Sequence, residues 1–185
     1  MEDQTAISLL KQGNLNGLET LVNRYQAKAV HAAYLITNER ALAQDVAQTA
    51  FIKAVERIHQ YDEDRSFAPW FFRIVINDAL KVAIRRKRSV SLEELDEPAE
   101  KIAQWLTDPT PQPDQLLEQK ELRENVLKAI RSLPPEQRAV VVMRYFLDLS
   151  EADMSEKMER PLSTIKWWLR DARKRLKKLI AYDRS

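Results

Sequence analysis

Apolar side chains recur every three or four residues along most of this chain, with polar and charged residues between them. This spacing places the apolar residues on one face of a helix, so it predicts helix rather than strand. The β-branched run Val140-Val141-Val142 lies inside a helical pattern opened by Pro134, Pro135 and Glu136. Ahead of residue 150, helices are predicted at about residues 18–32, 39–61, 68–88, 114–132 and 135–147.

Two more helices are predicted at the C-terminal end, where a short helix, a turn and a basic helix follow one another. The short helix covers residues 150–158, the turn 159–162 and the basic helix 163–179. Ser150 and Asp153 have the spacing of a capping box, which marks the start of a helix. This order of elements is typical of a helix-turn-helix, a unit that reads DNA.

The basic helix carries two parallel stripes of residues. Its apolar stripe, expected to be buried, comprises Ile165, Leu169, Ala172 and Leu176. One residue further on, a cationic stripe comprises Lys166, Arg170, Arg173 and Lys177. Such a helix can be seated in a domain by one stripe while the other binds DNA phosphates. The alternative is a solvated cationic face on an ordinary surface helix.

The tandem Trp167-Trp168 helps to choose between these two interpretations. Trp168 lies at the edge of the apolar stripe and is expected in the core. Trp167 should project beside Lys166 and Arg170. An exposed tryptophan within a basic surface favours contact with a partner over an idle face.

Composition supports helix throughout, because the 185 residues include only two glycines and many strong helix formers. The net charge of +2 hides an uneven distribution. Five basic residues fall in 81–88 without an acid, seven acids fall in 89–117 against Lys101, and residues 160–178 are again basic. The acidic segment also holds Pro98, Pro109, Pro111 and Pro113.

This distribution predicts an all-α fold of two small helical domains joined by an acidic, Pro-containing linker. The predicted boundaries are 1–90 for the first domain, 91–113 for the linker and 114–185 for the second domain, which contains the helix-turn-helix. Acids in the linker repel one another and favour extension. Basic regions on either side of it suggest two nucleic-acid surfaces.

Enzymatic chemistry is poorly supported by the residues present. His31 and His59 are the only histidines and have no metal-ligand or triad companions at recognisable spacing. Gly13 and Gly17 cannot form a phosphate-cradling loop, and there is no cysteine. We therefore expect no catalytic residue, metal or cofactor. No signal core or membrane-length apolar run is present, so we expect a cytoplasmic protein without membrane insertion.

Several of these segments resemble bacterial RNA polymerase sigma factors of the small extracytoplasmic-function group. Residues 42–54, LAQDVAQTAFIKA, are similar to the family helix AEDVVQETFLKAW, with Asp45, Gln48 and Phe51 matching directly. In the family this helix binds the clamp coiled coil of the polymerase β′ subunit. The resemblance therefore implies that these three residues bind core polymerase. An ordinary amphipathic helix would explain Phe51 as a core residue.

A second resemblance covers residues 67–77, FAPWFFRIVIN, which are similar to the family element FRTWLYRIARN. That element contacts and melts the −10 promoter region, and the loop before it, here 61–66, holds a flipped base. The implied −10 DNA-binding residues are Trp70, Arg73, Asn77, Lys81, Arg85 and Arg86. Plain core packing is the alternative for Phe71 and Phe72, and Trp70 fits either role.

A third resemblance covers the C-terminal helices, which are similar to the family domain that reads the −35 element. Residues matching its signature are Pro161, Thr164, Lys166, Leu169, Ala172 and Arg173. The implied −35 DNA-binding residues are Thr164, Lys166, Trp167, Arg170, Asp171 and Arg173.

This chain departs from the signature in ways that bear on the −35 region. Trp167, Trp168 and Asp171 stand where the family has a small residue and two arginines, which indicates an unusual −35 sequence or a smaller contribution from it. An aspartate in the major groove can accept from cytosine N4, so Asp171 is predicted to specify a base. Ser155 and Glu159 replace the usual alanine and glycine, so the turn is expected to differ.

Together these resemblances imply a sigma factor that binds core RNA polymerase through the β′ clamp coiled coil and the β flap, recognises the −10 and −35 elements of promoter DNA, and opens the duplex. They also imply that the linker threads through polymerase channels and that an anti-sigma factor can hold the protein inactive. The alternative is a free-standing helix-turn-helix regulator whose N-terminal helices sense a signal or dimerise.

Overall fold

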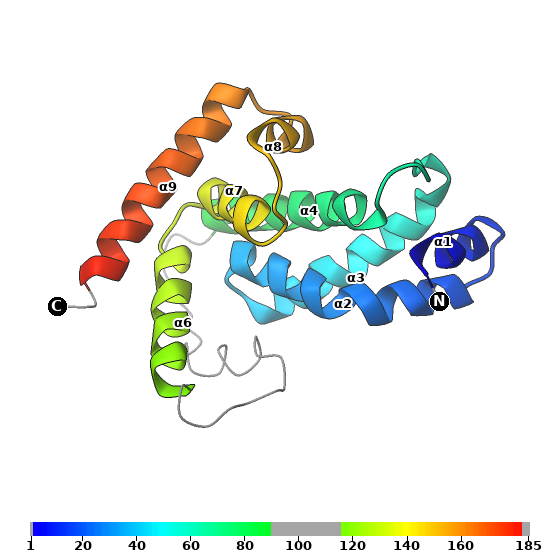
Figure 1. Ribbon diagram of the computed structural model, residues 1–185, viewed down its shortest axis with the longest axis horizontal. Helices are drawn as coiled ribbons and strands as arrows, with labels where there is room; N and C mark the ends of the chain where they lie inside the picture. The colour runs from blue at the N-terminus through cyan, green and yellow to red at the C-terminus, as the bar shows by residue number, and fades with distance from the viewer. Residues whose placement is uncertain (1, 90–115, 183–185) are drawn as a thin grey trace. The chain divides into compact units, whose positions relative to one another are not determined.

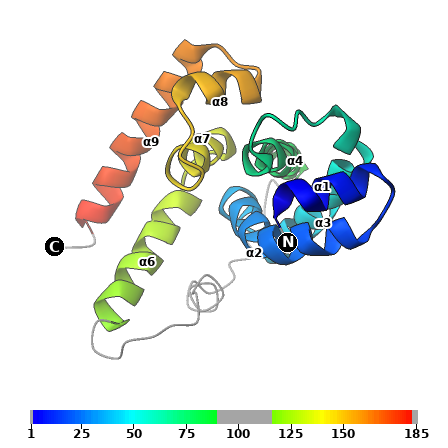
Figure 2. The same ribbon diagram turned by 45° about the vertical axis from the view of Figure 1, so that its right-hand side comes forward.

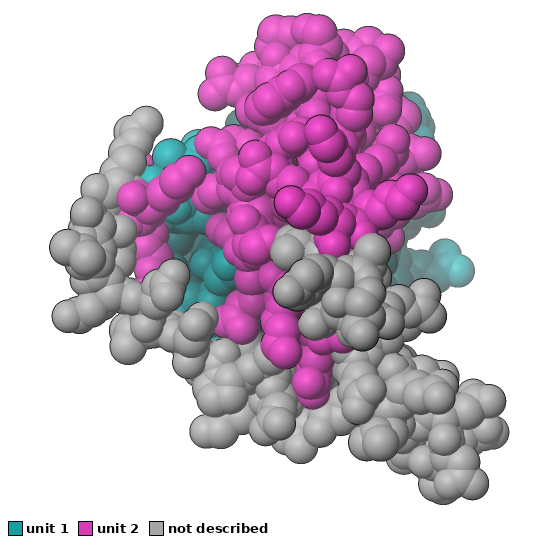
Figure 3. Space-filling model, turned by 90° about the vertical axis from the view of Figure 1, so that its left-hand side faces the viewer, with its two compact units in different colours: residues 1–84 teal, residues 85–185 magenta. Residues whose placement is uncertain are grey.

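The computed structural model describes residues 2–89 and 116–182, and its regular elements there are all helices (Figure 1). The chain divides into two compact units, residues 1–84 and 85–185 (Figure 3). The predicted all-α fold with two helical domains is confirmed. The predicted linker lies outside the described residues.

The first unit is built from α1 (Asp3–Lys11), α2 (Asn16–Thr37), α3 (Arg40–Glu56), the 3₁₀ helix η1 (Ile58–Gln60) and α4 (Phe67–Ser89), which extends past the unit boundary. Helices α2 and α3 pack side by side (Figures 1 and 2). Helix α1 packs on α2 and was not among the helices predicted from the sequence.

The helix predicted over 39–61 is shorter in the structure, because α3 ends at Glu56 and η1 follows. Ile58 and Tyr61, which are three residues apart, are both buried. In a 3₁₀ helix, residues at this separation lie on the same face, so the tighter turn lets both side chains reach the core.

Aromatic rings fill the core between α2, α3 and α4. Phe51 of α3 lies 4.5 Å from Phe71 of α4, and Phe67 stacks on Phe71 at 5.7 Å. Tyr25 of α2 lies within 6.2 Å of Phe67 and Phe72 as well. Because the rings interlock across three helices, α3 and α4 are held in a fixed relation.

Two further contacts tie the helices of this unit together. Lys53 of α3 pairs with Asp78 of α4 through Nζ to oxygen distances of 2.7 and 2.9 Å, and Asp78 is largely shielded from solvent. At Gly17 of α2, a Cβ atom would lie 2.1 Å from the carbonyl oxygen of Ala6 in α1. Only glycine therefore allows α1 to approach α2 so closely.

The second unit contains α6 (Leu116–Arg131), α7 (Pro135–Tyr145), α8 (Glu151–Met158) and α9 (Leu162–Tyr182). Helices α6, α7 and α8 all pack against α9. The α6–α7 corner is closed by buried Arg138, whose guanidinium donates to the carbonyl oxygens of Arg131 and Leu133. Val140, Val141 and Val142 lie within α7 as predicted, and all three are buried.

The helix-turn-helix follows the sequence prediction closely. The Ser150 side chain accepts from the Asp153 amide, and the Asp153 side chain accepts from the Ser150 amide, so the predicted capping box is present. Ile165, Leu169 and Ala172 of the apolar stripe are fully buried, and Leu176 packs against Leu133 and Val141. Phe146, just beyond the end of α7, is partly exposed.

Candidate polymerase and nucleic-acid interfaces

The outward face of α3 presents two of the three residues predicted to bind polymerase. Asp45 and Gln48 are exposed, whereas Phe51 is 7 % exposed and packs on Phe71. Ile52 lies on the exposed side, and its side chain is 60 % exposed, which is unusual for a branched apolar residue. The exposed face of α3 therefore includes Asp45, Gln48 and Ile52, and Phe51 belongs to the hydrophobic core beneath it. We call these three exposed residues the α3 face.

Most of the residues predicted to contact the −10 region line one side of α4. Trp70, Arg73, Asn77, Lys81 and Arg85 follow one another at intervals of three or four residues, so they share a helical stripe, here called the α4 stripe. Lys81 and Arg85 are exposed and the other three are half-buried. Arg86 falls on the opposite side of the helix, so the structure does not bring it into this stripe.

Trp70 sits where the α4 stripe meets the loop 61–66. Its ring lies 5.3 Å from that of Tyr61 and 5.6 Å from that of Phe67, so one part of it is packed while the rest reaches solvent. Tyr61 is buried, and its hydroxyl donates to the carbonyl oxygen of Arg65. Burial raises the pKa of the Tyr61 hydroxyl. Phe71 and Phe72 are buried, so for both of them core packing is the correct interpretation.

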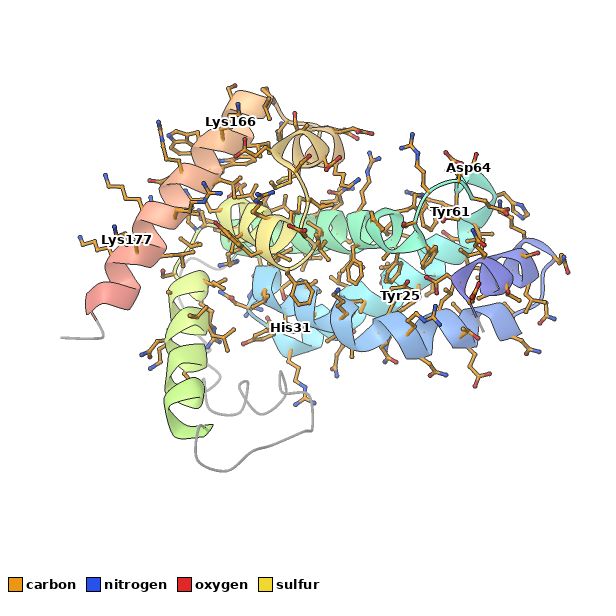
Figure 4. All side chains as sticks on the ribbon, viewed as in Figure 1. Tyr25, His31, Tyr61, Asp64, Lys166 and Lys177 are labelled. Atoms are coloured by element: carbon orange, nitrogen blue, oxygen red, sulfur yellow. The ribbon has the colours of Figure 1, made fainter. Side chains whose placement is uncertain are left out.

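Helix α1 supports this loop from the other side. Lys11 Nζ donates to the Tyr61 carbonyl oxygen at 3.4 Å and pairs with Glu63 at 2.5 Å. Residues 62–66, which follow Tyr61, are exposed, and Tyr61 and Asp64 mark the loop in Figure 4. The anchors hold a short exposed loop at the start of the α4 stripe, and α1, which supplies Lys11, was missed by the sequence analysis.

Helix α9 presents a continuous cationic surface beside its buried stripe. Lys166, Arg170, Arg173 and Lys177 are all exposed, with Lys166 and Lys177 marking its two ends in Figure 4. Trp167 is 51 % exposed, Trp168 is partly buried, and Thr164 is half-buried near the start of the helix. We call the four exposed cations together with Trp167 the α9 face. Its exposed cations and ring are suited to phosphate contact and stacking.

Asp171 takes part in contacts within the protein. Its Oδ2 accepts from Nε2 of buried Gln137 in α7 at 2.7 Å and from Nε of Arg175 at 2.9 Å. The hydrogen bond from Gln137, followed by that from Arg175, holds the pKa of Asp171 below its usual value. The carboxylate thus ties α9 to α7, which competes with the predicted role of reading a base.

The turn between α8 and α9 differs from a glycine turn in its composition rather than in its path. Glu159 adopts φ 53° and ψ 45°, the left-handed conformation in which glycine is favoured. The Arg160 amide donates to the Ser155 carbonyl oxygen, and the Ser155 hydroxyl donates to the Arg160 carbonyl oxygen at 2.6 Å. Ser155 therefore reinforces a turn that Glu159 strains.

Neither a metal site nor a membrane-spanning helix is found among the described residues. No group of histidine, cysteine and acidic side chains in the described ranges could hold a metal ion. Among the helices of residues 2–89 and 116–182, none combines the length and apolar character that a membrane span requires.

Comparison with known families gives two matches along the chain. The model described as Sigma-70 region 2 matches residues 21–90, which include α3, the loop 61–66 and the α4 stripe. The model described as Sigma-70, region 4 matches residues 123–176, which include α7, the helix-turn-helix and most of α9. Helix α1 precedes the first match.

Known proteins are similar over nearly the whole chain. The RNA polymerase sigma-H factor of Pseudomonas aeruginosa is 28 % identical over 181 residues, covering 97 % of this chain and 94 % of that protein. The ECF RNA polymerase sigma-E factor of Haemophilus influenzae is 31 % identical over 172 residues, covering 90 % and 88 %. The ECF RNA polymerase sigma factor SigW of Bacillus subtilis is 26 % identical over 176 residues, covering 94 % of both.

Solved structures share the fold. CnrH in complex with the cytosolic domain of CnrY aligns with a TM-score of 0.63 at 19 % identity, covering 98 % of both chains. The sigma factor RpoE of Bartonella quintana, in complex with the anti-sigma factor NepR, aligns with a TM-score of 0.65 at 18 % identity, covering 89 % of this chain and 97 % of that one. At these identities the likeness is one of fold.

Proposed function

This chain belongs to the extracytoplasmic-function group of RNA polymerase sigma factors, and from that premise we propose that it directs core polymerase to promoters through −10 and −35 contacts and opens the DNA. Members of this family act in transcription initiation without being enzymes themselves.

The observation that carries the proposal is the direct packing of α3 on α4. The α3 face, Asp45, Gln48 and Ile52, points outward, while Phe51 and Lys53 of the same helix contact Phe71 and Asp78 of α4. A partner helix pair bound to the α3 face would therefore be coupled through a packed core to the α4 stripe. We assign the α3 face to the β′ clamp coiled coil.

For the −10 region, the α4 stripe offers an aromatic ring followed by polar and cationic groups. Trp70 can stack on an unstacked base, and Lys81 and Arg85 can hold the backbone of a separated strand. The anchored loop 61–66 next to Trp70 provides a place for an extruded base. Arg86 lies on the other side of α4, so we assign it no part in this contact.

For the −35 region, the α9 face is supported by its exposed cations and by the exposed ring of Trp167. The N-terminal residues of α9 would meet base edges, and the later lysine and arginine side chains would hold phosphates. Asp171 is already engaged by Gln137 and Arg175, so we propose that it sets the orientation of α9.

The same premise extends to the remaining assignments. We place the polymerase-binding and −10 domain at residues 1–90, the linker at 91–113 and the −35 domain at 114–185, with the β flap contacting the last of these. We propose that the protein acts in the cytoplasm with polymerase. An anti-sigma factor is a further expected partner, because structures with this fold include sigma factors bound to such inhibitors.

Size-exclusion co-elution with cognate core RNA polymerase, at moderate salt to suppress nonspecific charge pairing, tests this proposal. The wild-type chain should co-elute stoichiometrically. The double variant Asp45→Ala, Ile52→Glu should elute separately, since it removes an acceptor and places a charge on the apolar part of the α3 face. Gln26→Ala, which alters an exposed residue on α2, serves as the matched control and should co-elute normally.

Two results would contradict the proposal. If the wild-type chain does not bind core polymerase yet binds duplex DNA specifically by itself, it is a free-standing helix-turn-helix regulator. If the chain binds polymerase and the double variant binds equally well, the α3 face is not the docking surface.

A further inference from the structure

Tyr145, the last residue of α7, exposes an aromatic ring beside α9. It is 62 % exposed, whereas Tyr25, Tyr34 and Tyr61 of the first unit are buried or half-buried. A single exposed ring is ordinary on a protein surface and means little by itself. What distinguishes Tyr145 is its contact with a cation of the α9 face.

The hydroxyl oxygen of Tyr145 accepts a hydrogen bond from Nε of Arg173 at 2.8 Å. The guanidinium carbon of Arg173 also lies 6.0 Å from the centre of the tyrosine ring. An arginine side chain has many rotamers, and ordering it on binding is unfavourable. Two contacts from one tyrosine restrict Arg173 before any ligand arrives.

The contact leaves the strongest donors of Arg173 unused. A guanidinium carries five N–H groups, and the bond to Tyr145 occupies only the one on Nε. The terminal nitrogens, which can bind a phosphate through two parallel hydrogen bonds, have no partner among the described residues. The hydroxyl hydrogen of Tyr145 also remains available as a donor.

Charges around the pair favour an anion. Lys166, Arg170 and Lys177 share the exposed stripe with Arg173. The acid on the same helix, Asp171, is engaged by Gln137 and Arg175. Held donors within a cationic surface are the arrangement that a nucleic-acid backbone requires.

We propose that Tyr145 and Arg173 form a clamp for one phosphate of duplex DNA bound along α9, with Tyr145 acting as the positioning residue for Arg173. The inference deepens the proposed function and rests on its assignment of α9 to the −35 duplex. By holding one phosphate, the clamp fixes the position of α9 on the duplex. Because a phosphate is present at every base step, the clamp carries no base preference of its own.

The test compares Tyr145→Phe, Arg173→Ala and the double variant in the full chain. Binding is measured by fluorescence anisotropy with labelled duplex DNA at several salt concentrations, for the holoenzyme on promoter DNA and for the free chain. Tyr145→Phe keeps the ring and the fold, and should weaken binding about fivefold, which corresponds to the roughly 1 kcal/mol of one ordinary hydrogen bond. Arg173→Ala should weaken binding further and reduce the salt slope by about 1.

A structural role and a positioning role are separated by the double variant. If Tyr145 acts through Arg173, Tyr145→Phe should change affinity by less than about twofold once Arg173 is alanine. Thermal midpoints of wild type and Tyr145→Phe should agree. Lys128→Ala removes one positive charge from exposed α6 and is the matched control, for which little change in affinity is expected.

Several outcomes would overturn the clamp. These are equal binding by wild type and Tyr145→Phe, an undiminished effect of Tyr145→Phe in the Arg173→Ala background, and a change in base preference across a −35 library. Failure of the wild-type chain to bind core polymerase would contradict the sigma proposal but not the clamp, which the free-chain arm tests separately. Absence of DNA binding in both arms would overturn the clamp as well.

Discussion

At the scale of single residues, Glu159 shows the clearest conflict between side chain and backbone. A left-handed conformation costs an L-residue roughly 1–2 kcal/mol, and glycine does not incur that energy. We therefore expect Glu159→Gly to stabilise the C-terminal unit by about 1 kcal/mol, measured by urea or thermal unfolding. Asp148→Gly is the matched control, because Asp148 also has positive φ but aspartate tolerates it better, so its gain should be smaller.

A second residue-scale prediction separates packing from contact on α3. Phe51→Ala should destabilise the first unit by about 3–5 kcal/mol, because it empties space against Phe71. Ile52→Ala, at an exposed site on the same helix, should change stability by less than about 0.5 kcal/mol but reduce affinity for core polymerase. Chemical denaturation and co-elution measured on both variants check this. Equal stability of the two variants would show that Phe51 is not a core residue.

The same pair of residues shows what the sequence could reveal about the candidate interfaces. The string 42–54 identified the helix and its family, and Asp45 and Gln48 are exposed as a contact requires. The string could not separate Phe51 from Ile52, because the buried side of α3 depends on where α4 lies. Likewise the contact of Tyr145 with Arg173 joins residues 28 positions apart, so no local sequence pattern predicts it.

At the scale of helices, one ionised carboxylate adds a hydrogen bond to the apolar packing of α9 on α7. The pKa of Asp171 is lowered in the folded protein, chiefly by the hydrogen bond from Gln137. The resulting stabilisation is therefore fully present above the ordinary pKa of 3.8 and is lost as the pH falls through the lowered value. Acid should thus loosen the α7–α9 contact.

Hydrogen exchange of the α7 and α9 amides near pH 3 and pH 6 measures this effect. Asp171→Asn, which retains an acceptor for Gln137 but carries no charge, should make the α7–α9 protection nearly independent of pH in that range. Protection of α8, which depends on the separate pair Ser150 and Asp153, should respond to acid as in the wild type. If acid lowers the protection of the α9 amides in Asp171→Asn as much as in the wild type, the Asp171 carboxylate is not the source of the acid sensitivity.

Helix boundaries were predictable where local chemistry marks them. The capping box of Ser150 and Asp153 and the proline pair before α7 mark helix starts, and both lie as expected. The end of α3 at Glu56 was missed because the change to η1 is driven by burial of Ile58 and Tyr61. Helix α1 was missed because its short amphipathic pattern gains its stability from packing on α2.

At the scale of the whole chain, the two compact units agree with the uneven distribution of charge and proline that suggested two domains. Two helices, α4 and α9, each carry exposed cations along one side. A small net charge of +2 therefore coexists with two surfaces suited to nucleic acid. Composition could predict this division, but the close approach of α1 to the loop 61–66 required the fold.

The role of the contact between α1 and the loop 61–66 can be tested at Gly17. In Gly17→Ala the new Cβ would meet the Ala6 carbonyl oxygen, so α1 must shift and Lys11 must move from Tyr61. We expect binding to core polymerase to persist while promoter opening falls several-fold, read as lost permanganate reactivity of promoter thymines. Gly13→Ala, with φ 79° and open space around it, strains the backbone without moving α1 and should open promoters normally. Normal opening by Gly17→Ala would show that the loop does not need α1.

The ion pair of Lys53 and Asp78 also has a consequence for the history of this sequence. Because the two charges lie 2.7 Å apart and Asp78 is shielded from water, reversing either one alone places like charges together, whereas exchanging both restores attraction. Mutations at these sites should therefore be accepted in pairs over evolutionary time. An alignment of descendants of this protein should show the two columns changing sign together, although one lies on α3, which we assign to polymerase, and the other on α4, which we assign to DNA.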